Sequence, residues 1–318
     1  MRLHLTKNLN SFKTLITELS EQYNIANFIL EKDYYVTLIL KELALKQENG
    51  LPAYFKGGTA LYKTIKSVRR FSEDIDLTVC VDNLGNNQKK VQLENSVKKY
   101  TCLSYKGSPI NLKGNITSEY IYKSLFLETI TVFNSLEIIK VEATSFTISE
   151  PVIELKISPM IYDLASLETK KILEDNFDIK PFFLKTISLS RIFIDKVFAT
   201  EFFFARAQKN ETLYLDVSKH LYDLTILLEQ KEIIDTITNI NKLNKIISLT
   251  RKEEALRMGS TLTNKPIKDF SYLNKVLTNK KFQVAFKNMQ IIYVFNQKEY
   301  LTIKDISKTI EQLKTIFI

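Results

Sequence analysis

The spacing of apolar residues predicts that the chain begins with helices. In residues 9–19 apolar side chains recur every three or four positions, which indicates an amphipathic helix. The pattern breaks at residues 24–26, and a second helix is expected over residues 28–45. That second helix carries a charged cluster, Glu31-Lys32-Asp33, whose simplest interpretation is a solvated helix face.

The pattern changes at Tyr54. An apolar run there predicts a strand, Gly57-Gly58-Thr59 predicts a turn, and Leu61, Ile65 and Val68 share one face of an amphipathic helix. The stretch ends in Asp74-Ile75-Asp76-Leu77, which alternates polar and apolar residues. Successive side chains of a strand point to opposite faces, so this alternation places two carboxylates on one face and two apolar side chains in a core.

Two carboxylates two positions apart repel each other unless a cation lies between them. Asp74 and Asp76 therefore suit Mg²⁺, which prefers oxygen ligands and completes its shell with substrate phosphates. A glycine turn before a helix offers backbone N–H groups to a phosphate, with Thr59 as an N-cap or a further donor. Lys63 is also assigned to nucleotide binding. The alternative is a solvated strand face beside an ordinary turn, but only 7 glycines occur in 318 residues, and two of them stand here.

The middle of the chain predicts further strands. Residues 83–125 are polar and lysine-rich and suggest an insertion at the rim of the site, whose lysines either follow an RNA backbone or are simply solvated. Two segments rich in β-branched residues, 138–143 and 152–157, predict strands. After Pro181 the pattern is helical to the end, with long helices over residues 187–208 and around residues 218–224.

Composition limits the classes of protein that remain. A length of 318 residues allows one large or two modest domains, and we expect a first domain over residues 1–180 and a helical second domain over 181–318. No apolar run reaches the roughly 20 residues that span a bilayer, and the N-terminus lacks the apolar core of a signal peptide. We therefore expect a cytoplasmic protein without a membrane partner.

Catalysis by zinc or by a Ser-His-Asp triad is disfavoured. The two cysteines have no partner at metal-ligand spacing, and the two histidines, His4 and His220, leave a triad one candidate without a nucleophile elbow. Carboxylates, lysines and a metal ion should carry the chemistry. The net charge of +9 fits a polyanionic partner such as RNA, although a lysine-rich surface alone gives a similar value.

Several motifs together resemble one family. Residues 57–61 (GGTAL) and 70–77 (RFSEDIDL) resemble the signature of the AbiEii/AbiGii-type nucleotidyltransferase toxins of type IV toxin–antitoxin systems, in the DNA polymerase β-like nucleotidyltransferase superfamily. RIFIDK at residues 191–196 and KHLYDL at 219–224 are similar to the family's RTFxEK and RHxYDL elements. EKDYYV at residues 31–36 is similar to its EKDxxV element, which is expected to pack behind the glycine turn. The departures, Asp195 for glutamate and Ile192 for threonine, remove no catalytic group.

The resemblance implies roles for further residues. Such transferases place a third carboxylate beside the Asp pair, and Glu142 matches best, with Glu154 as the alternative. Lys196 would hold the triphosphate and balance charge as pyrophosphate leaves, and Asp223 would either fix that lysine or activate the acceptor hydroxyl. Without the resemblance, both are ordinary helix charges. The implied fold is α+β (α/β), with a small mixed sheet flanked by helices and a helical C-terminal domain.

The predicted function is transfer of a nucleoside monophosphate from an NTP to RNA. The resemblance implies two Mg²⁺ ions (or Mn²⁺) as cofactors, the 3′ end of tRNA as acceptor, an AbiEi-like antitoxin as partner and a role in phage defence. Two alternatives stay open. One is transfer to a protein or small-molecule hydroxyl, and the other is a non-catalytic nucleotide-binding module.

Overall fold

A computed structural model describes residues 3–65, 70–106, 110–112, 114–126, 137–257 and 260–317. The chain forms two compact units. The N-terminal unit comprises Met1–Lys66, Phe71–Ser145 and Val152–Thr186, and the C-terminal unit comprises Ser67–Arg70, Phe146–Pro151 and Ile187–Ile318.

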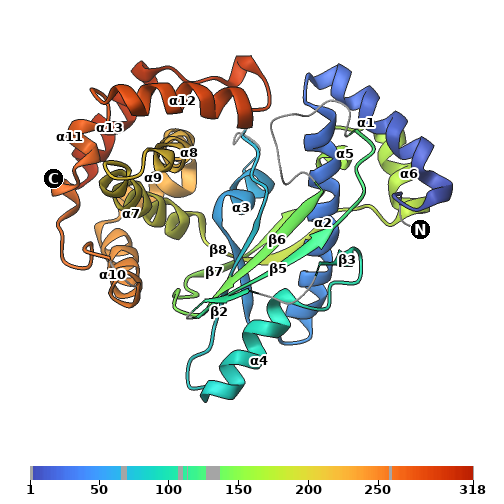
Figure 1. The fold of residues 1–318 in the computed structure, drawn as a ribbon, viewed down its shortest axis with the longest axis horizontal. Coiled ribbons are helices and arrows are strands. Elements are labelled where there is room, and N and C mark those ends of the chain that lie inside the picture. Colours follow the sequence, from blue (N-terminus) through green and yellow to red (C-terminus); the bar gives the residue numbers. More distant parts are fainter. Residues whose placement is uncertain are drawn as a thin grey trace. The chain divides into compact units, whose positions relative to one another are not determined.

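The N-terminal unit is built on a mixed sheet (Figure 1). Among the described residues the sheet has eight strands in the order β3-β5-β6-β2-β1-β8-β7, and β4 pairs with β5. β1 is antiparallel to β2 and parallel to β8, whereas β2 and β6 run parallel. The strands are β1 (Ala53–Lys56), β2 (Ile75–Val79), β3 (Ser104–Tyr105), β4 (Ile110–Leu112), β5 (Asn115–Ile121), β6 (Ile138–Thr144), β7 (Val152–Ile157) and β8 (Phe182–Ile187).

Alternation along β2 separates the core from the polar face. Ile75 and Leu77 are fully buried in the core, while Asp76 between them is partly exposed. Asp74 lies one residue before the strand begins and is also partly exposed. The prediction that the two apolar residues of this motif enter a core is therefore confirmed.

Helices pack around this sheet. They are α1 (Leu9–Tyr23), α2 (Asn27–Glu48), α3 (Gly57–Thr64), α4 (Asn86–Val97), α5 (Met160–Asp163) and α6 (Leu167–Phe177). The first two agree with the predicted helices, and Asn24, in the left-handed region with φ 53°, ends α1. The third differs from expectation, since Gly57 and Gly58 are its first residues rather than a turn before it. The helix ends at Thr64, and Val68 lies outside the described residues.

The segment predicted as an insertion contributes to the sheet. β5 pairs with β6 over seven consecutive residue pairs, and its side chains alternate between buried and partly exposed positions. Ile116, Ser118 and Tyr120 face the core, although serine and tyrosine gave the segment a polar appearance in the sequence. This part of residues 83–125 is therefore integral to the fold.

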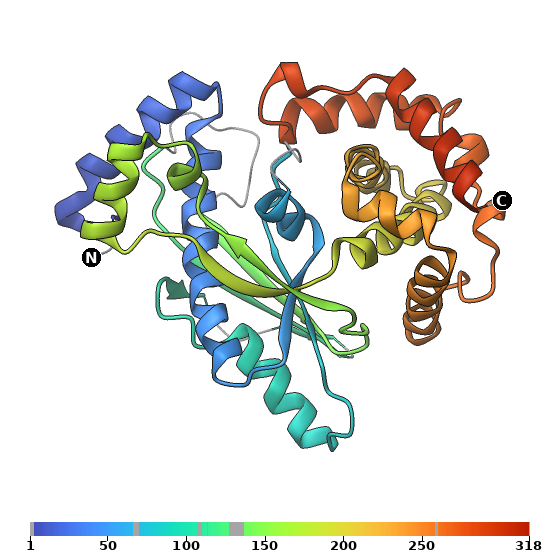
Figure 2. The ribbon, with the colours of Figure 1, turned by 180° about the vertical axis from the view of Figure 1, so that it is seen from behind.

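The C-terminal unit is helical (Figure 2). Its helices are α7 (Leu189–Ala207), α8 (Tyr214–Leu227), α9 (Lys231–Thr238), α10 (Ile240–Leu256), α11 (Tyr272–Lys275), α12 (Lys280–Tyr293) and α13 (Ile303–Phe317). The predicted boundary after residue 180 differs from the observed division, because β8 follows it and pairs with β1 through Thr186 and Phe55. The α+β fold class is confirmed. Among the described residues, no helix is long and apolar enough to cross a bilayer.

Candidate active site

Asp76 occupies the middle of a three-strand polar row. In the strand register it stands opposite Lys56 on β1 and opposite Glu142 on β6. Side chains directly opposite on neighbouring strands point to the same face, with Cβ atoms about 5 Å apart. The sheet therefore places the Asp76 and Glu142 carboxylates next to each other, on the face that the buried Ile75 and Leu77 do not use.

Gly57 touches Asp76 so closely that no other residue fits its position. Its φ is +81°, and a Cβ added there would lie 2.1 Å from the Asp76 carboxylate oxygen Oδ2. Both the backbone conformation and the space thus require glycine. The residue before it, Lys56, is the N-cap of α3 and makes no side-chain capping hydrogen bond, so side-chain capping does not occupy the first-turn N–H groups of α3. Gly57 and Gly58 are both partly exposed.

Thr59 connects α3 to the acidic motif. Its side chain is fully buried, and its hydroxyl donates a hydrogen bond to the main-chain carbonyl of Asp74. Thr59 is therefore not the N-cap, and in this arrangement its hydroxyl positions the backbone that leads into β2. Its predicted contact with phosphate stays a prediction.

The pKa of Asp74 indicates that carboxylates are crowded around it. Burial, followed by the negative charge of Glu142, raises the pKa of Asp74 to about 6, against the opposing effects of Lys140 and Lys32. Glu73 raises this pKa further. A bound cation would relieve this repulsion, because it favours the ionised form of every carboxylate around it.

The donor set fits a hard divalent cation. Asp74, Asp76 and Glu142 offer only oxygen ligands, which Mg²⁺ prefers over nitrogen and sulfur. Within the residues that the structure describes, no three His, Cys, Asp or Glu side chains are already grouped as a metal site.

The strand order separates the two candidates for the third carboxylate. Glu142 on β6 is directly opposite Asp76. Glu154 lies exposed on β7, and β1 and β8 lie between β7 and β2. At about 4.8 Å per strand, β7 is about 14 Å from β2. Glu142 is the glutamate that the sheet places beside the aspartates.

The Glu31-Lys32-Asp33 cluster forms a buried ionic framework. All three residues are fully buried, so the solvated face considered from the sequence is wrong. Lys32 pairs with Glu73 at 3.0 Å, directly before Asp74. Asp33 pairs with Lys63 of α3 at 2.6 Å, and that ammonium also donates to the Ser158 carbonyl at 2.9 Å. The framework therefore anchors α3 through Lys63 and the segment that leads into Asp74 through Glu73.

Lys63 has a structural role in this arrangement. Its side chain is 1% exposed, and two oxygen atoms accept from its ammonium group. The predicted contact between Lys63 and a nucleotide stays a prediction. Glu31 is held in a similar way, since its carboxylate accepts from the Ser124 hydroxyl at 2.6 Å and the Leu125 N–H at 2.8 Å.

The C-terminal unit contains a second buried charged cluster. Lys196 on α7 pairs with Asp223 on α8 at 2.6 Å. Arg70 makes a bidentate contact with the same carboxylate, at 2.6 Å through Nε and 2.5 Å through Nη2. Burial alone would raise the pKa of Asp223, but the charges of Arg70 and Lys196 outweigh it and hold that pKa at about 2. So acidic a carboxyl group is a poor proton acceptor, which favours the role of fixing the lysine.

Arg70 is the residue that the sequence interpretation missed. It opens the RFSEDIDL motif, but nothing in the sequence indicates that its partner stands 153 positions later. The signal was its place in the motif, four residues before Asp74.

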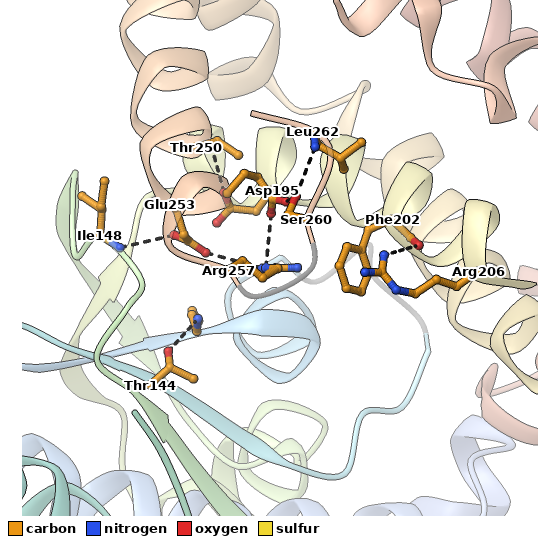
Figure 3. A network of polar contacts seen from close by, with 12 residues as sticks. Thr144, Ile148, Asp195, Phe202, Arg206, Thr250, Glu253, Arg257, Ser260 and Leu262 are labelled. Atoms are coloured by element: carbon orange, nitrogen blue, oxygen red, sulfur yellow. Dashed lines mark hydrogen bonds and ion pairs between the residues drawn. The ribbon is translucent and has the colours of Figure 1, made fainter. Parts of the chain in front are cut away.

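A second network in this unit joins α7 to α10 (Figure 3). The Asp195 carboxylate accepts from the Thr250 hydroxyl at 3.0 Å and from Arg191 Nε at 2.7 Å. Arg191 also pairs with Glu253 at 2.5 Å, and Glu253 accepts from the Ile148 N–H at 3.3 Å. Since Arg191 is fully buried, these contacts fix the start of α7, and Lys196 projects from the same helix five residues after Arg191.

Two acidic strands beside a glycine-initiated helix define a site suited to transfer of a phosphate-bearing group. Comparison with protein families gives the particular class. The family described as "Nucleotidyl transferase AbiEii toxin, Type IV TA system" matches residues 38–300, most of the 318-residue chain. The chain belongs to this family: it is a nucleotidyltransferase and the toxin of a type IV toxin–antitoxin system, with an antitoxin as its partner. No curated protein matches it.

Proposed function

We propose that this toxin transfers a nucleoside monophosphate from an NTP to the 3′ end of tRNA and that the reaction depends on Mg²⁺. The observation that carries the proposal is the register of Asp76 with Glu142, with Asp74 two positions away and its pKa raised by Glu142. Three carboxylates crowded on one face are costly without a cation, and phosphoryl transfer uses such a cation to neutralise charge.

The chemistry is an in-line displacement. The acceptor hydroxyl oxygen forms a bond to the α-phosphorus, the bond from that phosphorus to the bridging oxygen breaks, and pyrophosphate leaves with the electron pair while the hydroxyl proton passes to solvent. Asp74, Asp76 and Glu142 would hold Mg²⁺, which would supply charge neutralisation and lower the pKa of the attacking hydroxyl. Mn²⁺ offers the same chemistry, since it too accepts oxygen ligands.

The residues of the chain position the substrate. The N–H groups of Gly57 and Gly58 at the start of α3 donate to the β- and γ-phosphates, aided by the positive end of the helix dipole. Thr59 and the Lys32–Glu73 pair keep the Asp74 segment in place during the reaction. This arrangement supports catalysis by positioning, which is the main requirement for phosphoryl transfer.

Lys196 is proposed to hold the triphosphate and to balance the charge of the departing pyrophosphate. Support comes from its place in the RIFIDK motif and from its buried contact with Asp223. The ion pair with the Asp223 carboxylate, whose pKa is about 2, holds the lysine in one orientation. Asp223 is then a positioning residue, and Arg70 supports it.

RNA is the acceptor that the charge of the chain favours. A net charge of +9 suits a polyanion, and RNA binding would weaken steeply with salt, whereas binding of a protein or a small-molecule acceptor would not. We further propose that the partner is an AbiEi-like antitoxin and that the pair acts in phage defence. Expression of the toxin alone should then arrest growth, and the Asp76→Ala variant should not.

The decisive experiment is a labelling assay. The purified protein is incubated with total tRNA, Mg²⁺ and each α-³²P-labelled NTP separately, next to Asp76→Ala and the surface control Asp175→Ala. We expect label on tRNA from wild type and from Asp175→Ala, loss of label in Asp76→Ala, and no label without a divalent cation. Label on protein instead of RNA would show that the acceptor is a protein. Label transferred by Asp76→Ala would show that the site is wrong.

A further inference from the structure

Three consecutive phenylalanines near the end of α7 cannot all face the core. Successive residues of a helix are about 100° apart, so Phe202, Phe203 and Phe204 span more than one face. Phe204 is buried at 2% exposure, whereas Phe202 and Phe203 stay partly exposed. Two aromatic rings thus lie side by side on the surface of the C-terminal unit, their centroids 5.4 Å apart and their planes at 83°.

Arginines cover the first of these rings. The guanidinium of Arg206 lies 3.4 Å from the Phe202 ring centroid, and that of Arg257 lies 5.1 Å from it. Figure 3 shows Phe202, Arg206 and Arg257, with the Arg206 guanidinium hydrogen-bonded to the Phe202 carbonyl at 3.2 Å. Arg257 is oriented by Glu253 at 3.6 Å and Glu254 at 3.3 Å. The guanidinium planes are therefore fixed over or near the ring.

The second ring stacks on a neutral imidazole. His220 of α8 lies 5.5 Å from Phe203 with an interplanar angle of 28°. Burial and then the charge of Lys196 hold the pKa of His220 well below its ordinary value, so the imidazole is uncharged at neutral pH. Its Nδ1 is buried, and among the described residues it has no hydrogen-bond partner.

Aromatic rings interleaved with arginines suit single-stranded nucleic acid. Bases stack on aromatic rings and on guanidinium planes, while the arginine charges attract the backbone. We propose that Phe202, Phe203, Arg206, His220 and Arg257 form a stacking surface that binds an unpaired stretch of the RNA acceptor. The proposal rests on the proposed function, since it names where that RNA is held. Stacking needs no base-specific contact, so this surface recognises an unpaired end rather than a sequence.

Binding of RNA without catalysis tests the surface directly. Anisotropy of a fluorescein-labelled single-stranded oligoribonucleotide is measured with the full chain, without NTP, between about 50 and 200 mM salt. Phe202→Leu and Phe203→Leu keep the apolar character but remove the ring. Phe183→Leu, at a phenylalanine of β8 that is 59% exposed, is the matched control.

We expect the Phe202 and Phe203 variants to bind at least about fivefold more weakly, with the salt dependence unchanged, because stacking and not charge is lost. Arg206→Lys, which keeps the charge but loses the plane, should weaken binding in the same way. Affinities equal to that of Phe183→Leu, or a wild type that does not bind the oligonucleotide, would overturn the proposal. Thermal unfolding of each variant checks that the fold is retained.

The labelling assay separates this proposal from the proposed function. Phe202→Leu should raise the KM for RNA while the KM for NTP and kcat stay unchanged. A wild type that labels RNA, together with an unchanged KM in Phe202→Leu, would refute the stacking surface and leave the proposed function standing. A wild type that binds the oligonucleotide through these rings but labels no RNA would refute the proposed function alone.

Discussion

Replacing Gly57 by alanine should disable the site through a single methyl group. The added Cβ would lie 2.1 Å from Asp76 Oδ2, while ordinary contacts begin at 3.4 Å, so the carboxylate must move by about 1.3 Å. Misplacing a catalytic group by about 1 Å costs roughly 100-fold in rate. We therefore expect Gly57→Ala to lower transfer about 100-fold in the labelling assay.

The same substitution also strains the backbone, and a control must separate the two effects. Gly57 has φ +81°, where an L-residue costs about 1–2 kcal/mol. Gly50 has φ +88°, but a Cβ there meets nothing within 4 Å. Gly50→Ala should thus lose a similar 1–2 kcal/mol in urea unfolding, yet transfer at the wild-type rate. If Gly57→Ala and Gly50→Ala transferred equally well, the contact between Gly57 and Asp76 would have no part in catalysis.

Three further predictions concern the charged residues. Asp223→Asn should lower the free energy of unfolding in urea by about 3–5 kcal/mol, because the buried Arg70 and Lys196 lose their charged partner. The control Asp178→Asn, at the exposed pair with Lys41, should cost less than about 1 kcal/mol. The pKa of Asp223 is about 2 instead of its ordinary 3.8, so its ionised carboxylate adds about 2 kcal/mol of stability above pH ~4. This contribution should be lost as the pH falls towards 2. An unfolding free energy that does not change across this pH range would contradict the assignment. Glu142→Gln should lower transfer at least about tenfold, and Glu154→Gln should leave it unchanged, whereas the reverse result would move the third carboxylate to β7.

Local patterns were enough to predict the elements that form the candidate site. A strand repeats every two residues, so the Asp74–Leu77 alternation revealed which side chains are buried before any fold was known. Helical spacing predicted α1, α2, α7 and α8 in the same way. The motifs were specific enough to indicate the family that the comparison with protein families then showed.

Polar residues misled the interpretation where their partners are distant in sequence. The Glu31-Lys32-Asp33 cluster was interpreted as a solvated face, yet it is buried because Glu73 and Lys63 neutralise two of its charges. Periodicity cannot reveal such partners, since it reports which residues share a face and not what that face meets. β5 looked polar for the same reason, although it lies between β3 and β6 in the sheet.

The sequence by itself determined the residue types, their local spacing and therefore the class of reaction. Only the tertiary structure decided which groups meet: Glu142 rather than Glu154 beside Asp76, and Arg70 on Asp223. The physical reason is that strand order and helix packing depend on burying apolar surface over the whole chain, and that burial brings together residues as far apart as the 153 positions between Arg70 and Asp223.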